Sequence, residues 1–278
     1  MKVATIGFFD GVHRGHRFLI QSVIESARAL RAQSVLITFN RHPLSVLHSE
    51  NSPELLTLED ERQYLLRQTG VDEIVVLPFS TELSLLSARD FMAEVLKERL
   101  GVTTLILGYD HHFGNKNMGH DYESYGRELG IEILRCGEVN GVSSSLIRSL
   151  LLVGDIKSAN ESLGYNYFIR GIVVHGHHLG RTIGFPTANL DIAHEKLLPR
   201  EGAYCVRVVV GEYEYDGMMN IGRNAVEVHL LDFEGNLYGK RIEIKVTDFI
   251  RSETEFTSLD ELKNQLEKDK QYLLCQKY

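Results

Sequence analysis

The hydrophobic pattern changes part-way along the 278 residues of this chain. In the first half, short β-branched runs alternate with segments of helical periodicity, which predicts a parallel, doubly wound sheet with ligands at the carboxyl ends of its strands. Beyond Gly164 the segments are β-rich and separated by turn residues, which predicts an antiparallel β-barrel, followed by one amphipathic helix from Ser258 to Leu274. A chain of this length exceeds the usual size of one compact domain, so we expect two.

Each half has its own set of expected elements. The strands expected in the first half are Val3 to Ile6, Ser34 to Phe39, Glu73 to Leu77, Thr104 to Leu107 and Ile131 to Leu134. Its helices are expected at Arg17 to Leu30, Leu58 to Thr69 and Asp90 to Leu100, the last opened by Ser87 and Asp90 at capping-box spacing. The strands expected in the second half are Tyr167 to His175, Ala203 to Val210, Tyr213 to Asn220, Val226 to Asp232 and Lys240 to Thr247.

A short helical segment is expected to join the two halves. Leu146 to Leu163 has the pattern of two short helices that break at Gly154-Asp155 and end at Gly164. Gly235 to Arg241 lacks the spacing and the Ser/Thr of a P-loop, and we interpret it as a hairpin turn.

Composition narrows the class of protein. With 43% hydrophobic and 24% charged residues the chain is typical of an ordinary soluble globular protein. A net charge of -8 argues against non-specific binding of nucleic acid, and no run approaches the roughly 18 apolar residues of a membrane span. Cys136, Cys205 and Cys275 form no C-x-x-C pair, and the N-terminus lacks the features of a signal peptide, so a reducing cytoplasm is favoured.

A glycine- and histidine-rich turn follows the first expected strand. His13 and His16 flank Gly15 just before the first helix, where free backbone N–H groups and the helix dipole attract phosphate. The alternative is a histidine pair at one-turn spacing that is solvated or binds a transition metal. Because glycines lie in the turn, we favour phosphate recognition. The segment from Gly7 to His16 also resembles a motif of nucleotidyltransferases that make FAD, and this resemblance implies four candidate nucleotide-binding residues: Gly7, Phe9, Asp10 and Gly15.

A second constellation follows the first strand of the second half. A loop rich in glycine, histidine and arginine leads to Pro186, and Thr187 and Asn189 then place two neutral oxygens on one face of an extended chain. Magnesium prefers such ligands alongside phosphate and water. The segment therefore predicts a site for a metal-bound polyphosphate, with three further candidate nucleotide-binding residues: Gly176, Arg181 and Gly184.

A third pattern marks a candidate catalytic carboxylate. Glu227 and His229 alternate with apolar residues and share one face of an expected strand. Taken alone, Glu227 would be an exposed strand carboxylate. With the neighbouring motifs, we favour a catalytic role.

These motifs resemble those of the bifunctional riboflavin kinase/FMN adenylyltransferase family. Three further segments in the first half resemble the same family: Thr38 to Pro43, Gly108 to Gly114 and Ser143 to Arg148. The resemblance implies that His13 and His16 stabilise the transferring α-phosphate, without a covalent enzyme intermediate, and that Arg148 is also catalytic. It implies that ATP phosphates bind Ser143, Ser144 and Ser145 at a helix N-terminus, and that flavin binds Asp110 and Phe113.

In the second half, the resemblance implies that Glu227 is the general base that removes the proton from the ribityl 5'-hydroxyl. It implies a flavin-side loop, Asp248 to Glu253, in which Arg251 contacts the substrate, and a metal bound by Thr187 and Asn189. Three residues and two loops depart from the family pattern. Phe8 replaces a common asparagine, Leu146 a frequent basic residue, and His120 an Asp or Asn. The loops at Arg223 to Val226 and Gly141 to Ser143 are shorter than those of the family. A genuine deletion before Glu227 would change the geometry that the family pattern implies for the kinase site.

The resemblance implies two reactions: riboflavin and ATP give FMN and ADP, and FMN and ATP then give FAD and pyrophosphate. Magnesium is expected in both steps, and riboflavin, FMN and ATP are the expected partners, with no nucleic acid or membrane. The expected domains are an adenylyltransferase at 1–150, a helical bridge at 151–166 and a kinase at 167–278. Two alternatives remain: a nucleotidyltransferase for another substrate with an accessory barrel, and a non-catalytic flavin-binding protein.

Overall fold

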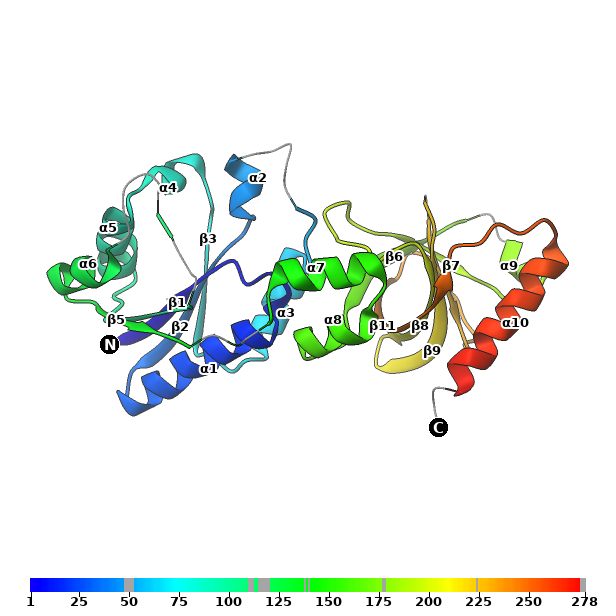
Figure 1. Cartoon of the computed structure of the whole chain (residues 1–278), viewed down its shortest axis with the longest axis horizontal. Coiled ribbons are helices and arrows are strands. Elements are labelled where there is room, and N and C mark those ends of the chain that lie inside the picture. Colours follow the sequence, from blue (N-terminus) through cyan, green and yellow to red (C-terminus); the bar gives the residue numbers. More distant parts are fainter. Residues whose placement is uncertain are drawn as a thin grey trace. The chain divides into compact units, whose positions relative to one another are not determined.

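The computed structural model describes residues 1–47, 53–109, 113–114, 121–137, 139, 141–176, 179–223 and 225–275, without the side chains of Leu47, Leu179 and Arg181. Contacts between Cα atoms divide the chain into two compact units, Met1–Ser144 and Ser145–Tyr278. Figure 1 shows a sheet with helices packed around it in the first unit and a barrel in the second.

The first unit is built on a five-stranded sheet in the order β3-β2-β1-β4-β5. Every neighbouring pair of these strands is parallel. The strand order reverses at β1, so the carboxyl end of β1 lies at the switch point where doubly wound sheets bind ligands. The strands are β1 (Lys2–Ile6), β2 (Gln33–Phe39), β3 (Glu73–Leu77), β4 (Thr104–Leu107) and β5 (Glu132–Arg135).

Helices cover this sheet. α1 (Arg14–Ala29) begins three residues before the predicted start at Arg17, because His13 acts as its N-cap and accepts a hydrogen bond from the backbone N–H of His16. Its apolar face packs on β1 and β2. The other helical elements are η1 (Asp10–Val12), α2 (Pro43–Leu47), α3 (Glu59–Arg67), α4 (Thr81–Leu85), α5 (Ala88–Asp90), the π-helix η3 (Phe91–Arg99) and α6 (Tyr122–Leu129).

The predicted capping residue Ser87 is confirmed. Its hydroxyl oxygen accepts a hydrogen bond from the backbone N–H of Asp90 at 3.0 Å. α6 was not predicted, because its eight residues are too few to establish a clear period. Local signals define it instead: Asp121 caps its start, and Gly130 ends it in the left-handed region with a φ of 70°.

Two short helices open the second unit, as predicted. α7 (Ser144–Val153) and α8 (Ile156–Leu163) are separated by Gly154, whose φ of 84° requires glycine. The Asp155 side chain caps α8 by accepting a hydrogen bond from the Ser158 N–H at 3.2 Å. Gly164 ends α8 in the left-handed region.

The rest of the second unit is a closed antiparallel barrel in the order β10-β7-β6-β11-β8-β9. The barrel, the parallel sheet and the terminal helix confirm the predicted fold class. The elements are β6 (Phe168–Val174), α9 (Leu179–Thr182), β7 (Ala188–Asp191), β8 (Gly202–Val210), β9 (Tyr213–Ile221), β10 (Val226–Leu230), β11 (Arg241–Ser252) and α10 (Leu259–Cys275).

Two predictions about the barrel were wrong. Asp248 to Glu253 was expected to be a loop, but β11 continues through Ser252, with irregular register between Val246 and Asp248 and between Phe249 and Arg251. These irregularities break the period-two pattern that identifies a strand in the sequence. Gly235 to Arg241 is not a hairpin turn, because β10 and β11 are not neighbours in the barrel.

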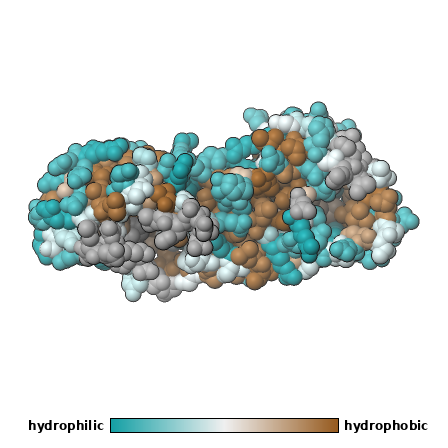
Figure 2. All heavy atoms as spheres, turned by 90° about the horizontal axis from the view of Figure 1, so that it is seen from above, coloured by the Kyte–Doolittle hydropathy of each residue, from teal (hydrophilic) through white to brown (hydrophobic). Residues whose placement is uncertain are grey.

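Hydrophilic and hydrophobic residues are interspersed over the face drawn in Figure 2. No helix within the described ranges combines the length and the apolar character needed to cross a membrane.

Candidate functional site

The loop after β1 holds an unusual backbone conformation. Phe9 and Val12 have positive φ angles of 57° and 38°, which side-chain-bearing residues rarely adopt, and Gly11 has a φ of 78°. Such strained positions persist only where the surroundings fix them, and they are common at functional sites. The loop lies at the carboxyl edge of the sheet, where the sequence placed the phosphate site.

The carboxylate of Asp10 fixes this loop. It accepts hydrogen bonds from Leu56 N–H at 3.1 Å, from Thr57 N–H at 2.9 Å and from the Thr57 hydroxyl at 3.0 Å. Asp10 is only 4% exposed, and the N–H of Gly11 donates to the Thr57 oxygen at 2.9 Å. These contacts tie the loop to the start of α3. Thr57 was missed by the sequence analysis, because it lies 47 residues from Asp10 and has no motif of its own.

His13 and His16 lie together at the start of α1. Their rings stack with centroids 3.6 Å apart, and the Phe9 and His16 rings meet edge to face with centroids 5.2 Å apart. The Nδ1 atom of His13 accepts a hydrogen bond from the His16 N–H at 3.3 Å, so neutral His13 carries its proton on Nε2. Burial lowers the pKa of His13 to about 4, against the opposing effect of Asp10. At neutral pH, His13 is therefore an uncharged hydrogen-bond donor.

Small residues let the loop pack closely. A side chain on Gly7 would lie 3.0 Å from the ring of Phe9, which is buried, and one on Gly15 would lie 3.2 Å from the His13 ring. The Ser144 hydroxyl donates to the backbone carbonyl of Asp10 at 3.0 Å, so the predicted serine cluster does reach the loop. Ser143 precedes α7, while Ser145 and Arg148 lie on it.

The flavin residues predicted in the first unit are only partly described. Asp110 and His120 lie outside the described residues. Phe113 packs against the rings of Phe91 and Tyr122, and its backbone N–H and carbonyl both bond the Tyr122 hydroxyl, at 2.8 and 2.9 Å. Phe113 therefore packs within the first unit, and its contact with flavin remains a prediction.

The second unit places three polar residues in one row, and two of them, Glu227 and Asn189, were predicted site residues. Glu227 on β10 lies directly opposite Asn189 on β7 and opposite Asn220 on β9. Residues in such register have neighbouring side chains on one face of the sheet. The short loop before Glu227 allows this alignment, because Ile221 pairs with Val226 and the Gly222 N–H donates to the Ala225 carbonyl at 3.0 Å. Asn220 was missed by the sequence analysis, although its place in β9 was predicted.

Glu227 lines a cavity of about 250 Å³ between the barrel and α10. Its apolar lining comprises Ile183, Phe185, Ala203, Met218, Met219, Phe256, Leu262 and Leu266. Its polar lining comprises Thr187, Asn220, Glu227, His229, Arg251, Glu253, Thr254 and Asp269. A cavity with both apolar and polar lining residues suits an organic ring that carries a polar chain.

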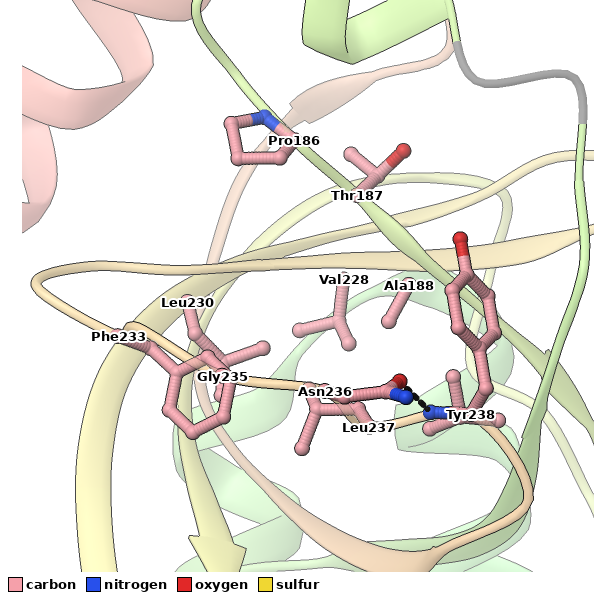
Figure 3. Close-up of a pocket in the computed structure, with 11 residues that line it drawn as sticks. Pro186, Thr187, Ala188, Val228, Leu230, Phe233, Gly235, Asn236, Leu237 and Tyr238 are labelled. Atoms are coloured by element: carbon pink, nitrogen blue, oxygen red, sulfur yellow. Dashed lines mark hydrogen bonds between the residues drawn. The ribbon is translucent and has the colours of Figure 1, made fainter.

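A second cavity, of about 330 Å³, lies on the other face of β10. Val228 and Leu230 line it, whereas Glu227 and His229 line the first cavity, as the alternation along a strand requires. Figure 3 shows Thr187 above Ala188 and Val228, with Tyr238 beside them. Thr187 lines both cavities.

The remaining kinase candidates have defined surroundings. Asn189 packs against Gly176, where any Cβ atom would come within 2.0 Å of the Asn189 amide nitrogen. Gly180 is packed equally closely against the Phe185 carbonyl, and Gly184 has a φ of 85°. The side chain of Arg181 lies outside the described part of the chain, so its predicted role is not addressed by the structure.

His229 and Arg251 line the first cavity but are held by other residues. The Nδ1–H of His229 donates to the Pro186 carbonyl at 2.8 Å, which leaves Nε2 as an acceptor. Burial lowers the pKa of His229, so this neutral form is favoured. The guanidinium of Arg251 pairs with Asp269 on α10 at 2.9 Å, and Asp269 is nearly fully buried. Arg251 therefore fastens the wall of the cavity that α10 provides.

Comparison with known proteins identifies the two halves. A model of FAD synthetase matches residues 1–149, and a model of riboflavin kinase matches residues 163–274. The chain is 37% identical over 283 residues to a bifunctional riboflavin kinase/FMN adenylyltransferase of Escherichia coli K12, covering 96% of this chain and 90% of that protein. This chain belongs to the bifunctional riboflavin kinase/FMN adenylyltransferase family.

Two further relatives agree with this membership in sequence or in fold. The bifunctional riboflavin kinase/FMN adenylyltransferase of Listeria monocytogenes is 36% identical, covering 97% of this chain and 90% of its own length. A crystal structure from Streptococcus pneumoniae, named a macrolide-efflux protein, superposes with a TM-score of 0.89 at 32% identity and covers 97% of this chain and 92% of that one. The resemblance inferred from the motifs is thus confirmed, and both enzymatic halves of the bifunctional family are present.

Proposed function

We propose that the chain makes FAD in two steps, each in its own unit. The second unit phosphorylates riboflavin with ATP to FMN, and the first unit transfers AMP from ATP to FMN and releases pyrophosphate. The two family matches support both activities, with ATP as co-substrate and FMN and FAD as products. One observation supports the site of the kinase step most directly: Glu227 lies directly opposite Asn189 on the adjacent strand and lines a cavity that shares Thr187 with a second cavity.

In the kinase step, riboflavin occupies the cavity that contains Glu227. The apolar side chains contributed by the barrel and α10 suit the flavin ring, and the ribityl chain extends toward Glu227. Glu227 accepts the proton of the 5'-hydroxyl as that oxygen bonds to the γ-phosphorus of ATP. The bond between the γ-phosphorus and the bridging oxygen breaks, and ADP leaves.

ATP occupies the second cavity in this proposal. The turn that carries Asn236 and Tyr238 provides one wall, and the Tyr238 ring is held by stacking on His175 at 4.0 Å. Thr187, which both cavities share, lies where the γ-phosphate would meet the 5'-hydroxyl. Gly176, Arg181 and Gly184 belong to the segments that approach the phosphates.

Thr187 and Asn189 are the proposed magnesium ligands of the kinase. A hydroxyl and a carboxamide oxygen fit Mg²⁺, which takes only part of its coordination from protein and the rest from phosphate and water. When bound, Mg²⁺ neutralises charge that develops on the phosphate oxygens. The contact between Asn189 and Gly176 limits the positions that the amide can take.

In the adenylylation step, the loop after β1 binds the ATP phosphates at the N-terminus of α1. The FMN phosphate oxygen attacks the α-phosphorus, and the bond to the pyrophosphate group breaks. His13 donates from Nε2–H, and with His16 it stabilises charge on the α-phosphate. Asp10 holds the loop through Thr57, and Gly7, Phe9, Asp10 and Gly15 keep the nucleotide-binding roles expected from the sequence. Ser143, Ser145, Arg148 and Asp110 keep the roles expected from the sequence, and Mg²⁺ is proposed here too.

We propose domain boundaries at 1–150, 151–166 and 167–278. The family matches over 1–149 and 163–274 and the division after Ser144 support boundaries near these positions. We also propose that the chain works in the cytoplasm, which is supported by the free thiols of Cys136, Cys205 and Cys275.

One assay tests the proposed function against its alternatives. The chain is incubated with riboflavin, ATP and magnesium, and the flavins are separated; we expect both FMN and FAD. A parallel reaction that starts from FMN tests adenylylation alone. Absence of both products would favour a nucleotidyltransferase for another substrate, and tight flavin binding without turnover would favour a binding protein.

A further inference from the structure

A buried arginine lies against the loop after β1 in the first unit. Arg62, on α3, is only 1% exposed. Its Nη2 atom donates to the carbonyl of Phe39, the last residue of β2, at 2.8 Å. Its guanidinium lies 4.0 Å above the ring of Phe8, which immediately follows Gly7 in the loop after β1. Arg62 thus contacts the end of β2 and the loop after the neighbouring strand β1, at the carboxyl edge of the sheet, where doubly wound sheets bind ligands.

The charge of Arg62 is poorly compensated. Among the described residues, its Nε and Nη1 atoms have no hydrogen-bond partner, and no carboxylate forms an ion pair with it. The pKa of Arg62 is lowered by burial, although Asp10 and Glu59 oppose the shift. An arginine side chain nevertheless stays protonated in proteins, so a positive charge is held in a dry environment. Such a group lowers the stability of the fold, so its retention at this place suggests that the charge serves another purpose.

Its surroundings indicate that purpose. Among carboxylates, Asp10 has the largest effect on the pKa of Arg62. Its carboxylate already accepts three hydrogen bonds from Leu56 and Thr57, and it forms no ion pair with the guanidinium. The positive field of Arg62 therefore extends into the loop that carries His13 and His16. Both substrates of the adenylylation step carry phosphate, and a cation in a low-dielectric setting attracts anions more strongly than one in water.

We propose that Arg62 is an electrostatic positioning residue for FMN adenylylation: its buried charge strengthens the binding of a substrate phosphate at the loop after β1, at the expense of stability. Arg62 acts through its electrostatic field, without touching substrate. This inference rests on the proposed function of the first unit.

Neutralising the charge while keeping its bulk tests the proposal. We expect Arg62→Met to fold with an unchanged or higher melting temperature, because an uncompensated charge is removed. The same variant should lower kcat/KM for FMN adenylylation by about tenfold or more. Arg62→Lys should restore most of that loss, and Arg67→Met, which removes an exposed charge from the same helix, should change neither property. Riboflavin phosphorylation by each variant serves as an internal control.

Two KM values show whether Arg62 attracts a phosphate of ATP or that of FMN. Each is measured for one of these substrates while the other is saturating. A rise in the KM for ATP assigns the charge to the nucleotide, and a rise in the KM for FMN assigns it to the FMN phosphate. Either supports the proposal. Wild-type adenylylation by Arg62→Met would overturn it, as would equal losses of stability and activity in both the Met and Lys variants, because shape would then be the requirement.

Two further outcomes are informative. If Arg62→Met fails to fold, Arg62→Gln replaces it, since glutamine can still donate to the Phe39 carbonyl. If that variant also fails, the charge is a structural requirement and the proposal is wrong. If the wild-type chain makes no FAD from FMN, the proposed function fails instead, so the two failures are distinguishable.

Discussion

Glu227 on β10 lies directly opposite Asn189 on β7 in the antiparallel register of the barrel. The register joins a candidate base and a candidate metal ligand that are 38 positions apart in the sequence. Because neighbouring strands fix both backbones, the two side chains are positioned by the sheet itself rather than by a loop. Rigid placement of this kind is what a phosphoryl transfer needs, since most of its catalysis is positioning.

Removal of the base should affect one step only. Glu227→Gln keeps the shape of the side chain but cannot accept the 5'-hydroxyl proton, so kinase kcat should fall by about a hundredfold or more. Adenylylation of supplied FMN should continue. Glu212→Gln, in an exposed turn, is a matched control. Rates of FMN formation check the prediction, and a wild-type rate would transfer the role of base to another residue, with His229 the first candidate.

The second step should respond to the histidine pair. His16→Ala removes an imidazole that stacks on His13, and FAD formation should be lost while FMN formation is largely kept. Separation of the flavins after reaction with riboflavin and ATP checks this result. Equal loss of both products in a folded variant would contradict two separate sites.

The pH dependence of stability should carry the signature of His13. Its pKa is lowered from 6.5 to about 4 in the folded chain, so the unfolded chain binds more protons between these values. The stability that neutral His13 contributes is therefore complete above pH 6.5 and is lost as the pH falls toward 4. The loss is at most roughly 3 kcal/mol by the usual conversion of a pKa shift.

His13→Asn isolates that contribution. Asparagine keeps a side-chain acceptor for the His16 N–H and is a good N-cap, but it does not titrate. Denaturant midpoints for the first-unit transition, measured from pH 7 to pH 4, should fall less steeply in the variant. Parallel curves for the two proteins would show that His13 does not carry the shift.

Docking of α10 should control riboflavin affinity. Asp269→Asn removes the charge that pairs with Arg251 and loosens the helix that lines the flavin cavity. The KM for riboflavin should rise by more than kcat falls, because the chemistry at Glu227 is not altered. Adenylylation of FMN should stay unchanged, and Asp260→Asn, at the exposed start of α10, provides the control. A normal KM would place the Arg251–Asp269 pair outside substrate binding.

Local patterns in the sequence predicted much of the fold. The change from helical alternation to β-rich segments indicated the sheet and the barrel, and the alternation around Glu227 correctly placed it on the same face as His229. Contacts between distant segments were not predictable. Thr57 holds Asp10 from 47 positions away, and Arg62 reads as an ordinary helix-surface arginine although it is buried. The bulges of β11 likewise conceal its length, because they interrupt the period that marks a strand.

The proposed magnesium site provides the sharpest test of the kinase assignment. If the Asn189 oxygen helps to place the metal on the ATP phosphates, Asn189→Ala should impair the kinase step and shift its magnesium dependence to higher concentration. Alanine supplies no ligand, and water alone does not impose the orientation. Riboflavin binding measured without nucleotide should change little, because Asn189 would hold the metal beside the ATP phosphates. Asn189→Asp, which offers a carboxylate oxygen at the same position, should keep more activity than alanine does.

The competing explanation is structural. Asn189 packs tightly against Gly176, so its loss could simply loosen the junction between the loop after β6 and β7. That explanation predicts a lower melting temperature with an unchanged magnesium dependence of the remaining activity. Kinase rates across a magnesium titration, run beside melting curves for Asn189→Ala and for the exposed control Asn264→Ala, separate the two. A stable variant whose kinase needs more magnesium supports coordination by Asn189, whereas a destabilised variant with the wild-type magnesium profile would assign Asn189 to the fold.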